Sequence, residues 1–190
     1  MRFQKHDLLD HFARQDRVYR VTLLASHWLG GGNQYTPSAG HEARTIHMQI
    51  NGRWIPFADL ADKLEDQTGM IQLTSEFSMN QLHALIRAPF ELLNDYCEDF
   101  DAANPATHLV GQLKSTSWYQ FARHIRNAIS HNFRYEFREK DRKDLPIVWN
   151  GITLSETMHG QAMSYEFGHR PGYMLFLEMR DFAEALPEVP

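Results

Sequence analysis

Arginine, asparagine and histidine side chains fall close together in residues 115–139, and these types can act on a phosphodiester. Arg126, Asn127 and His131 lie within one six-residue string. A guanidinium stays charged and pairs with phosphate, whereas an imidazole exchanges a proton near neutral pH. Metal-independent cleavage of a phosphodiester needs both actions. The alternative is an ordinary solvated face of an amphipathic helix.

The spacing predicts that residues 115–139 form one long helix. Ser115, Thr116 and Ser117 are candidate N-cap residues. At about 100° per residue, Asn127 and His131 would lie one turn apart on one face, with His124 almost directly below His131. The apolar stripe of this helix would comprise Trp118, Phe121, Ala122, Ile125, Ala128, Ile129 and Phe133, and its polar face Arg123, His124, Arg126, Asn127, Ser130, His131 and Arg134.

The string from Arg126 to His131, RNAISH, resembles the Arg-x4–6-His signature of HEPN domains (higher eukaryotes and prokaryotes nucleotide-binding). As in that family, a polar residue follows the arginine, and an aromatic-rich run, residues 118–123, precedes the motif. The resemblance implies an all-α bundle. In many family members it also implies a metal-independent endoribonuclease whose site forms between two protomers. Some subfamilies carry a tyrosine two residues after the histidine, where this sequence has Phe133, with Tyr135 two further on.

The resemblance also implies roles for the residues of the motif. His131 would be the general acid or base on the RNA 2′-hydroxyl or the leaving 5′-oxygen, and Arg126 would stabilise charge on the phosphate. Asn127 would orient the imidazole or the phosphate. The expected products carry 2′,3′-cyclic phosphate ends, and no metal or other cofactor is needed. Three supporting candidates are His124, Ser130 and Arg123, of which His124 is either a second proton-transfer group or a structural histidine.

Two other functions fit the same motif. The domain could be a non-catalytic HEPN binding or scaffolding module for a nucleotide, RNA or protein partner. It could also act as the toxin of a toxin–antitoxin or defence system, with an antitoxin as partner. In each case one helix offers one Arg126/His131 set, so a homodimer would bring two sets together.

Charge is unevenly distributed along the chain. The net charge is −5, whereas residues 114–143 contain eight basic and three acidic residues, which gives +5 there and leaves −10 elsewhere. A basic stripe on an acidic body can attract a polyanion locally. Alternatively, cations gather near a helix C-terminus, which does not fit Arg123 or Arg126. The residues that fit it are Arg138, Lys140, Arg142 and Lys143. The eight are Lys114, Arg123, Arg126, Arg134, Arg138, Lys140, Arg142 and Lys143.

The cysteine and histidine content narrows the classes of protein that fit this sequence. Cys97 is the only cysteine, which excludes an intramolecular disulfide and fits a reducing cytoplasm. Cys97 falls on the apolar face of a predicted helix, so we expect a core residue. The eleven histidines lack the spacings of a zinc site, so no metal is expected. No apolar run approaches the roughly 20 residues of a membrane span, and the N-terminal segment is too charged for a signal peptide.

The chain as a whole predicts a mainly α fold, an up-and-down HEPN-like helical bundle with two small β-hairpins. We expect a single domain, 1–190, in which 1–70 is an N-terminal helix and hairpin extension and 75–186 is the helical core. Helices 75–100 and 115–139 would be antiparallel neighbours. Trp28, Trp54, Trp118 and Trp149 are expected to pack in the core or on the hairpins.

Capping residues and turn residues give the approximate bounds of the expected helices and hairpins. Helices are expected over 5–29, 58–67, 75–100 and 172–186, with one further turn at 107–114. The first would end at Gly30–Gly32, the second near Gly69, and Ser75 or Ser78 would cap the third. Asn-Gly between apolar runs predicts hairpins over 45–57 and 146–154.

Overall fold

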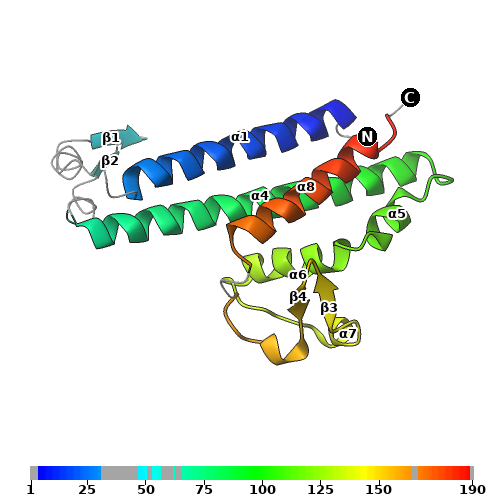
Figure 1. Ribbon diagram of the computed structural model, residues 1–190. Coiled ribbons are helices and arrows are strands. Elements are labelled where there is room, and N and C mark those ends of the chain that lie inside the picture. Colours follow the sequence, from blue (N-terminus) through cyan, green and yellow to red (C-terminus); the bar gives the residue numbers. More distant parts are fainter. Residues whose placement is uncertain are drawn as a thin grey trace. The chain divides into compact units, whose positions relative to one another are not determined.

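The computed structural model describes residues 4–30, 47–50, 53–56, 62, 66–163 and 167–188. These residues are mainly helical and include two antiparallel β-hairpins, which confirms the predicted fold class (Figure 1). The chain divides into two compact units, residues 18–81 and residues 1–17 with 82–190. The boundaries between the two units fall inside two long helices. That the chain forms a single domain stays a prediction.

The unit formed by residues 18–81 holds the predicted first hairpin. Strands β1 (His47–Ile50) and β2 (Arg53–Pro56) pair antiparallel, whereas the Asn51-Gly52 turn lies outside the described residues. Helix α1 (Lys5–Gly30) matches the predicted helix 5–29. The predicted helix 58–67 lies largely outside the described residues. Its expected end at Gly69 is wrong, because Gly69 lies within the next helix.

Helix α4 (Gln67–Ala103) begins earlier than the predicted residue 75. Asp66 caps it, since its Oδ2 accepts the Gly69 amide at 2.7 Å. The predicted caps Ser75 and Ser78 are wrong, because Ser78 Oγ instead donates to the Ser75 carbonyl inside the helix, at 3.0 Å. The helix ends just before Asn104-Pro105, as predicted. Its fully buried side chains include Leu82, Leu85, Ile86, Leu93, Tyr96 and Cys97.

The prediction of one helix over 115–139 is wrong. Helix α5 (Leu109–Ser115) ends where this helix was to begin, α6 (Tyr119–Ser130) spans only its middle, and α7 (Glu139–Arg142) begins after the non-helical residues 131–138. The predicted N-cap hydroxyls bond backwards instead. Ser115 Oγ donates to Gln112 O at 2.7 Å and Thr116 Oγ1 to Leu113 O at 2.8 Å, which ends α5. Asp101 of α4 caps α5, because its Oδ1 accepts the Leu109 amide at 2.7 Å. The α5 helix itself corresponds to the predicted turn at 107–114.

Helices α4 and α6 are antiparallel neighbours, as predicted. Tyr119 Oη donates to Asn94 Oδ1 at 2.8 Å at the start of α6. Just beyond its other end, the rings of Phe133 and His83 stack with centroids 4.1 Å apart. Residue numbers therefore fall along α4 as they rise along α6.

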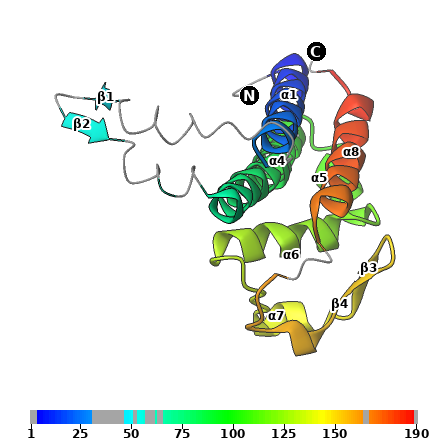
Figure 2. The ribbon, with the colours of Figure 1, turned by 60° about the vertical axis from the view of Figure 1, so that its left-hand side comes forward.

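The second predicted hairpin is confirmed and packs on α6. Strands β3 (Ile147–Trp149) and β4 (Ile152–Leu154) pair antiparallel around Asn150 and Gly151, whose φ angles are 48° and 78°. Positive φ at both central residues defines the type I′ turn that Asn-Gly favours. The ring of buried Trp149 lies 4.9 Å from that of Phe121 on α6. In both ribbon views α6 lies between this hairpin and the neighbouring part of α8 (His169–Ala185) (Figures 1 and 2).

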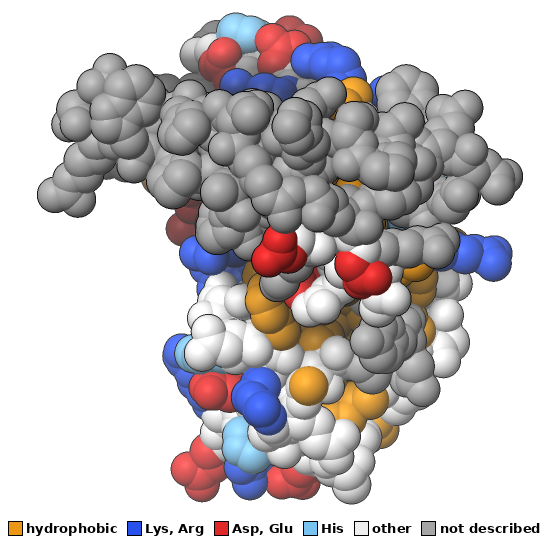
Figure 3. Space-filling model, turned by 90° about the vertical axis from the view of Figure 1, so that its left-hand side faces the viewer, with side chains coloured by type: hydrophobic (Ala, Val, Ile, Leu, Met, Phe, Trp, Pro, Cys, Tyr) orange, Lys and Arg blue, Asp and Glu red, His pale blue; other side chains and the backbone are white. Residues whose placement is uncertain are grey.

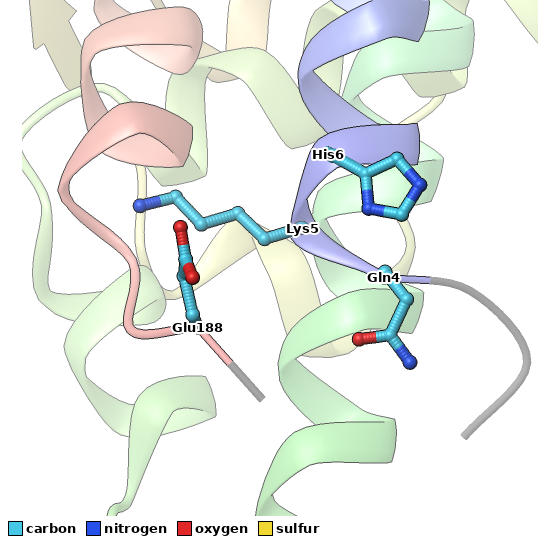
Figure 4. Close-up of a pocket in the computed structure, with 4 residues that line it drawn as sticks. All are labelled: Gln4, Lys5, His6 and Glu188. Atoms are coloured by element: carbon cyan, nitrogen blue, oxygen red, sulfur yellow. The ribbon is translucent and has the colours of Figure 1, made fainter. Parts of the chain in front are cut away.

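Helix α8 begins at His169 rather than at the predicted 172, so Pro171 lies in its first turn. A Cβ atom on Gly172 would lie 2.5 Å from Leu82 Cδ1, so glycine permits this close approach to α4. At the other end Lys5 Nζ donates to Glu184 O at 2.8 Å and Leu186 O at 2.6 Å. Lys5 therefore satisfies carbonyl groups that the helix end leaves unpaired (Figure 4).

Of the four tryptophans, Trp118 and Trp149 are buried, as predicted. The side chains of Trp28 and Trp54 lie outside the described residues. No helix in the described part of the chain is long and apolar enough to cross a membrane.

Candidate functional site

Helix α6 carries most of the candidate residues, and its apolar side fixes which of them reach the surface. Its buried residues are Tyr119, Phe121, Ala122, His124, Ile125 and Ala128. Arg126 and Asn127 lie partly exposed on the other side, as predicted. The placement of His124 on the exposed face is wrong, because only 2% of its surface is accessible.

The guanidinium of Arg126 is held by a carboxylate from α4. Its Nη2 lies 2.7 Å and its Nε 3.0 Å from Glu91 Oε1, and Nη1 donates to Asn127 Oδ1 at 3.2 Å. About a third of the side chain remains accessible, at 35%. The Asn127 amide therefore orients the arginine, while its backbone carbonyl accepts the His131 amide at 3.1 Å. Ser130 Oγ donates to the Arg126 carbonyl at 3.1 Å.

His131 caps the C-terminus of α6 and is not part of its side face. Its backbone, at φ −112° and ψ 50°, has left the helical region. The predicted continuation of the helix through His131 is therefore wrong, although the His131 amide still bonds the Asn127 carbonyl one turn earlier. The imidazole is 41% exposed, and Nδ1 lies 3.2 Å from Glu136 Oε2. A carboxylate on Nδ1 leaves Nε2 as the ring nitrogen that faces a ligand.

Two consecutive residues in the left-handed region turn the chain after His131. Asn132 has φ 54° and Phe133 φ 59°. Asparagine tolerates this conformation, whereas a bulky aromatic residue adopts it at a cost in free energy. The stack on His83 offsets that cost. Phe133 therefore anchors the turn, while Tyr135 is buried.

The segment after the turn is held by the loop before α8. Met163 N donates to Phe133 O at 2.7 Å, and Tyr135 exchanges backbone hydrogen bonds with Gly160 and Gln161. The Phe137 amide donates to His159 Nδ1 at 3.1 Å. These bonds flank Glu136, so its carboxylate is presented to His131 from a fixed backbone.

Arg123 and His124, two of the supporting candidates, belong to a structural cluster. Arg123 Nη1 lies 3.0 Å from Asp141 Oδ1, whose side chain is 4% exposed. The His124 ring meets Phe137 edge to face at 5.2 Å. Burial, with a smaller effect of Arg123, lowers the pKa of His124 to about 4, against the opposing influence of Asp141. The imidazole is therefore neutral at physiological pH, which favours the structural alternative over proton transfer.

Half of the basic residues between 114 and 143 have defined partners. Arg123 pairs with Asp141, Arg126 with Glu91 and Arg142 with Glu156, while Arg134 donates to the Gly160 carbonyl. On the face shown in Figure 3 basic and acidic side chains are intermixed. The long helix expected to end here is absent, but Lys140 and Arg142 lie in the last turn of the short helix α7, whereas Arg138 precedes that helix.

A metal site and a reactive thiol have little support in the part of the chain that the structure describes. There, no three His, Cys, Asp or Glu side chains are grouped to hold a metal ion. Cys97 is buried, as predicted, and burial, followed by the nearby Asp101, raises the pKa of its thiol to about 12. A pocket of about 200 Å³ near the start of α1 is lined by none of the candidate residues (Figure 4). Its lining residues are Gln4, Lys5, His6 and Glu188.

Three residues at the site were absent from the sequence-based prediction. Glu91 was visible as an i,i+4 partner of Arg87 on a predicted helix, but its bridge to α6 required the register of two helices. Glu136 and His83 contact the site only because the chain turns at residues 131–133.

Comparison of the chain with protein-family models, curated proteins and solved structures found no match.

Proposed function

We propose that this protein is a metal-independent endoribonuclease of HEPN type that leaves 2′,3′-cyclic phosphate ends. The observation that carries the proposal is the state of two side chains near the end of α6. Arg126 and His131 are both accessible to solvent, at 35% and 41%, and each is oriented by a carboxylate. A positioned cation and a positioned imidazole are the groups that this reaction requires.

In this proposal each side chain of the site has a role. His131 Nε2 takes the proton of the RNA 2′-hydroxyl, and the 2′-oxygen attacks the adjacent phosphorus. The bond from phosphorus to the 5′-oxygen then breaks, and that oxygen receives the proton that the His131 imidazole took up. Arg126 stabilises the negative charge on the phosphate, Asn127 fixes the guanidinium, and Glu136 fixes the imidazole through Nδ1.

The same proposal includes the oligomeric state, the location and the biological role of the protein. A two-fold homodimer would bring two Arg126/His131 sets together, and RNA would be the substrate. Cytoplasmic action and a toxin or defence role, with an antitoxin as partner, belong to this proposal. Growth inhibition on expression, relieved by His131→Ala, would support the toxin role.

The direct test is RNA cleavage in EDTA by the wild type, Arg126→Ala and His131→Ala, with circular dichroism to confirm folding. We expect the wild type to cut and leave cyclic-phosphate ends, and both folded variants to lose the activity. Thr153→Ala, an exposed change on β4, is a control. Equal cleavage by wild type and folded His131→Ala would contradict the proposal.

A second candidate function, a non-catalytic HEPN binding or scaffolding module, is favoured by one contact. The Arg126–Glu91 pair joins α6 to α4, so the arginine also serves as a bridge between helices. If this is its main role, Arg126→Ala lowers the unfolding midpoint or abolishes dimerisation, and no RNA is cut. RNA binding without turnover would identify RNA as the partner.

A further inference from the structure

Two arginines from neighbouring helices converge on one oxygen atom. Glu91 Oε1 lies 2.7 Å from Arg126 Nη2 and 3.0 Å from its Nε, and Arg87 Nε lies 3.2 Å from the same atom. One negative charge thus faces two positive charges, which leaves a net charge of +1. The side chains are accessible, at 50% for Arg87, 36% for Glu91 and 35% for Arg126.

This geometry is that of an anion site with a carboxylate in it. Guanidinium groups bind carboxylate and phosphate oxygens with the same planar donors. We propose that Arg87 and Arg126 form a two-arginine site for one RNA phosphodiester, and that Glu91 is a resident anion which the phosphate displaces. The inference rests on the proposed function for the identity of the ligand as RNA.

Displacement is physically reasonable for two reasons. The pairs are solvent-exposed, and exposed ion pairs are weak because water competes for both partners. Both arginines also share the single oxygen Oε1, whereas a phosphodiester offers two non-bridging oxygens. Each guanidinium would then obtain an acceptor of its own.

The chain contains a matched pair for comparison. Arg180 and Glu184 have the same i,i+4 spacing as Arg87 and Glu91 but lie within α8. Arg180 Nε lies 3.4 Å from Glu184 Oε1, and the Arg180 side chain is 36% exposed. Arg180→Ala and Glu184→Gln therefore reproduce the charge changes of the test variants outside the site.

The test is fluorescence anisotropy of a labelled 2′-O-methyl RNA, which binds but cannot be cleaved, at a series of KCl concentrations with the full chain. We expect Arg87→Ala to weaken binding about tenfold and to reduce the slope of log K against log salt by about 0.7, since one phosphate contact is lost. Glu91→Gln should tighten binding severalfold. Arg180→Ala and Glu184→Gln should each stay within about twofold of wild type, as exposed charges outside the contact.

The inference is overturned if Arg87→Ala behaves like Arg180→Ala, if Glu91→Gln behaves like Glu184→Gln, or if neither the wild type nor Glu91→Gln binds. Should Glu91→Gln fail to fold, Arg87→Ala decides alone, because half of the Arg87 side chain is in solvent. Cleavage of unmodified RNA separates the two proposals. If RNA binding depends on Arg87 but no RNA is cut, the two-arginine site is supported and the nuclease proposal is contradicted. If RNA is cut and neither Arg87→Ala nor Glu91→Gln changes cleavage, the nuclease proposal is supported and the two-arginine site is contradicted.

Discussion

His83 and Phe133 stack with their ring centroids 4.1 Å apart and their planes 26° from parallel. His83 is 8% exposed, and neither of its ring nitrogens has a hydrogen-bond partner among the described residues. A neutral imidazole fits this apolar contact, whereas an imidazolium would lose its hydration. The contact thus holds the turn after His131 and depends on the protonation state of one ring.

Acidification should therefore weaken the fold. Burial, with a smaller effect of His169, lowers the pKa of His83 to about 4, below the ordinary value of 6.5 that the unfolded chain would have. Between these values the unfolded state binds the proton and the folded state does not, so stability is complete above 6.5 and falls as the pH drops toward 4. We expect His83→Phe, which keeps an aromatic partner for Phe133, to flatten part of this dependence in urea unfolding. His124 titrates in the same window, so a remaining slope is expected. An unchanged pH profile in His83→Phe would contradict the assignment.

Asp101→Asn should lower the urea unfolding midpoint, because the amide replaces one of the two carboxylate oxygens that cap α5. The carboxylate accepts the amides of Leu109 and Val110 and the hydroxyl of Thr107. Desolvation raises the pKa of Asp101, but these hydrogen bonds outweigh it and the pKa is lowered. The stabilisation is thus present above the unfolded pKa and is lost as the pH falls through the folded one. The measurement is the urea midpoint at neutral and acidic pH, with exposed Asp95→Asn as control. Equal effects of the two substitutions would count against the cap.

Asp141→Asn should cost about 3 kcal/mol, because it leaves the guanidinium of Arg123 without its charged partner. The value lies at the low end for buried pairs, since the Arg123 side chain is 27% exposed. Thermal or urea unfolding measures the change, and Asp144→Asn, at an exposed position nearby, is the comparison. A loss of stability no greater than that of Asp144→Asn would mean that the pair does not hold α7 to α6.

Glu136→Gln should lower kcat about tenfold and leave KM nearly unchanged if the proposed nuclease chemistry holds, because this carboxylate positions His131 rather than binding RNA. Steady-state cleavage in EDTA provides both constants. Glu139→Gln, an exposed change three residues away, should have no effect. A rise in KM with constant kcat would instead place Glu136 among the groups that contact the substrate.

Periodicity and turn chemistry predicted much of this fold from the sequence. The Asn150-Gly151 hairpin, the span of α1 and the antiparallel pairing of α4 and α6 are confirmed. Each depends on neighbours in sequence or on a repeating apolar pattern, which the sequence shows directly.

The errors occurred where contacts distant in sequence decide the backbone. The apolar pattern runs on from Ile129 to Phe133, so a helix through His131 was the natural prediction. The stack with His83 instead favours two left-handed residues at this position. Glu91 and Glu136 were missed as partners of the motif for the same reason, since each reaches its partner only after helices pack or the chain turns.

The contacts between α4 and α6 also suggest an order of folding. Asn94 and Tyr119 are 25 residues apart, Glu91 and Arg126 are 35 apart, and His83 and Phe133 are 50 apart. Closing a longer loop costs more chain entropy, and each earlier contact shortens the loop that remains. The contacts between the two helices can therefore form one after another, beginning at the end next to α5. On this route the turn that carries His131 docks last, so the candidate site is completed only after the helices beneath it have paired.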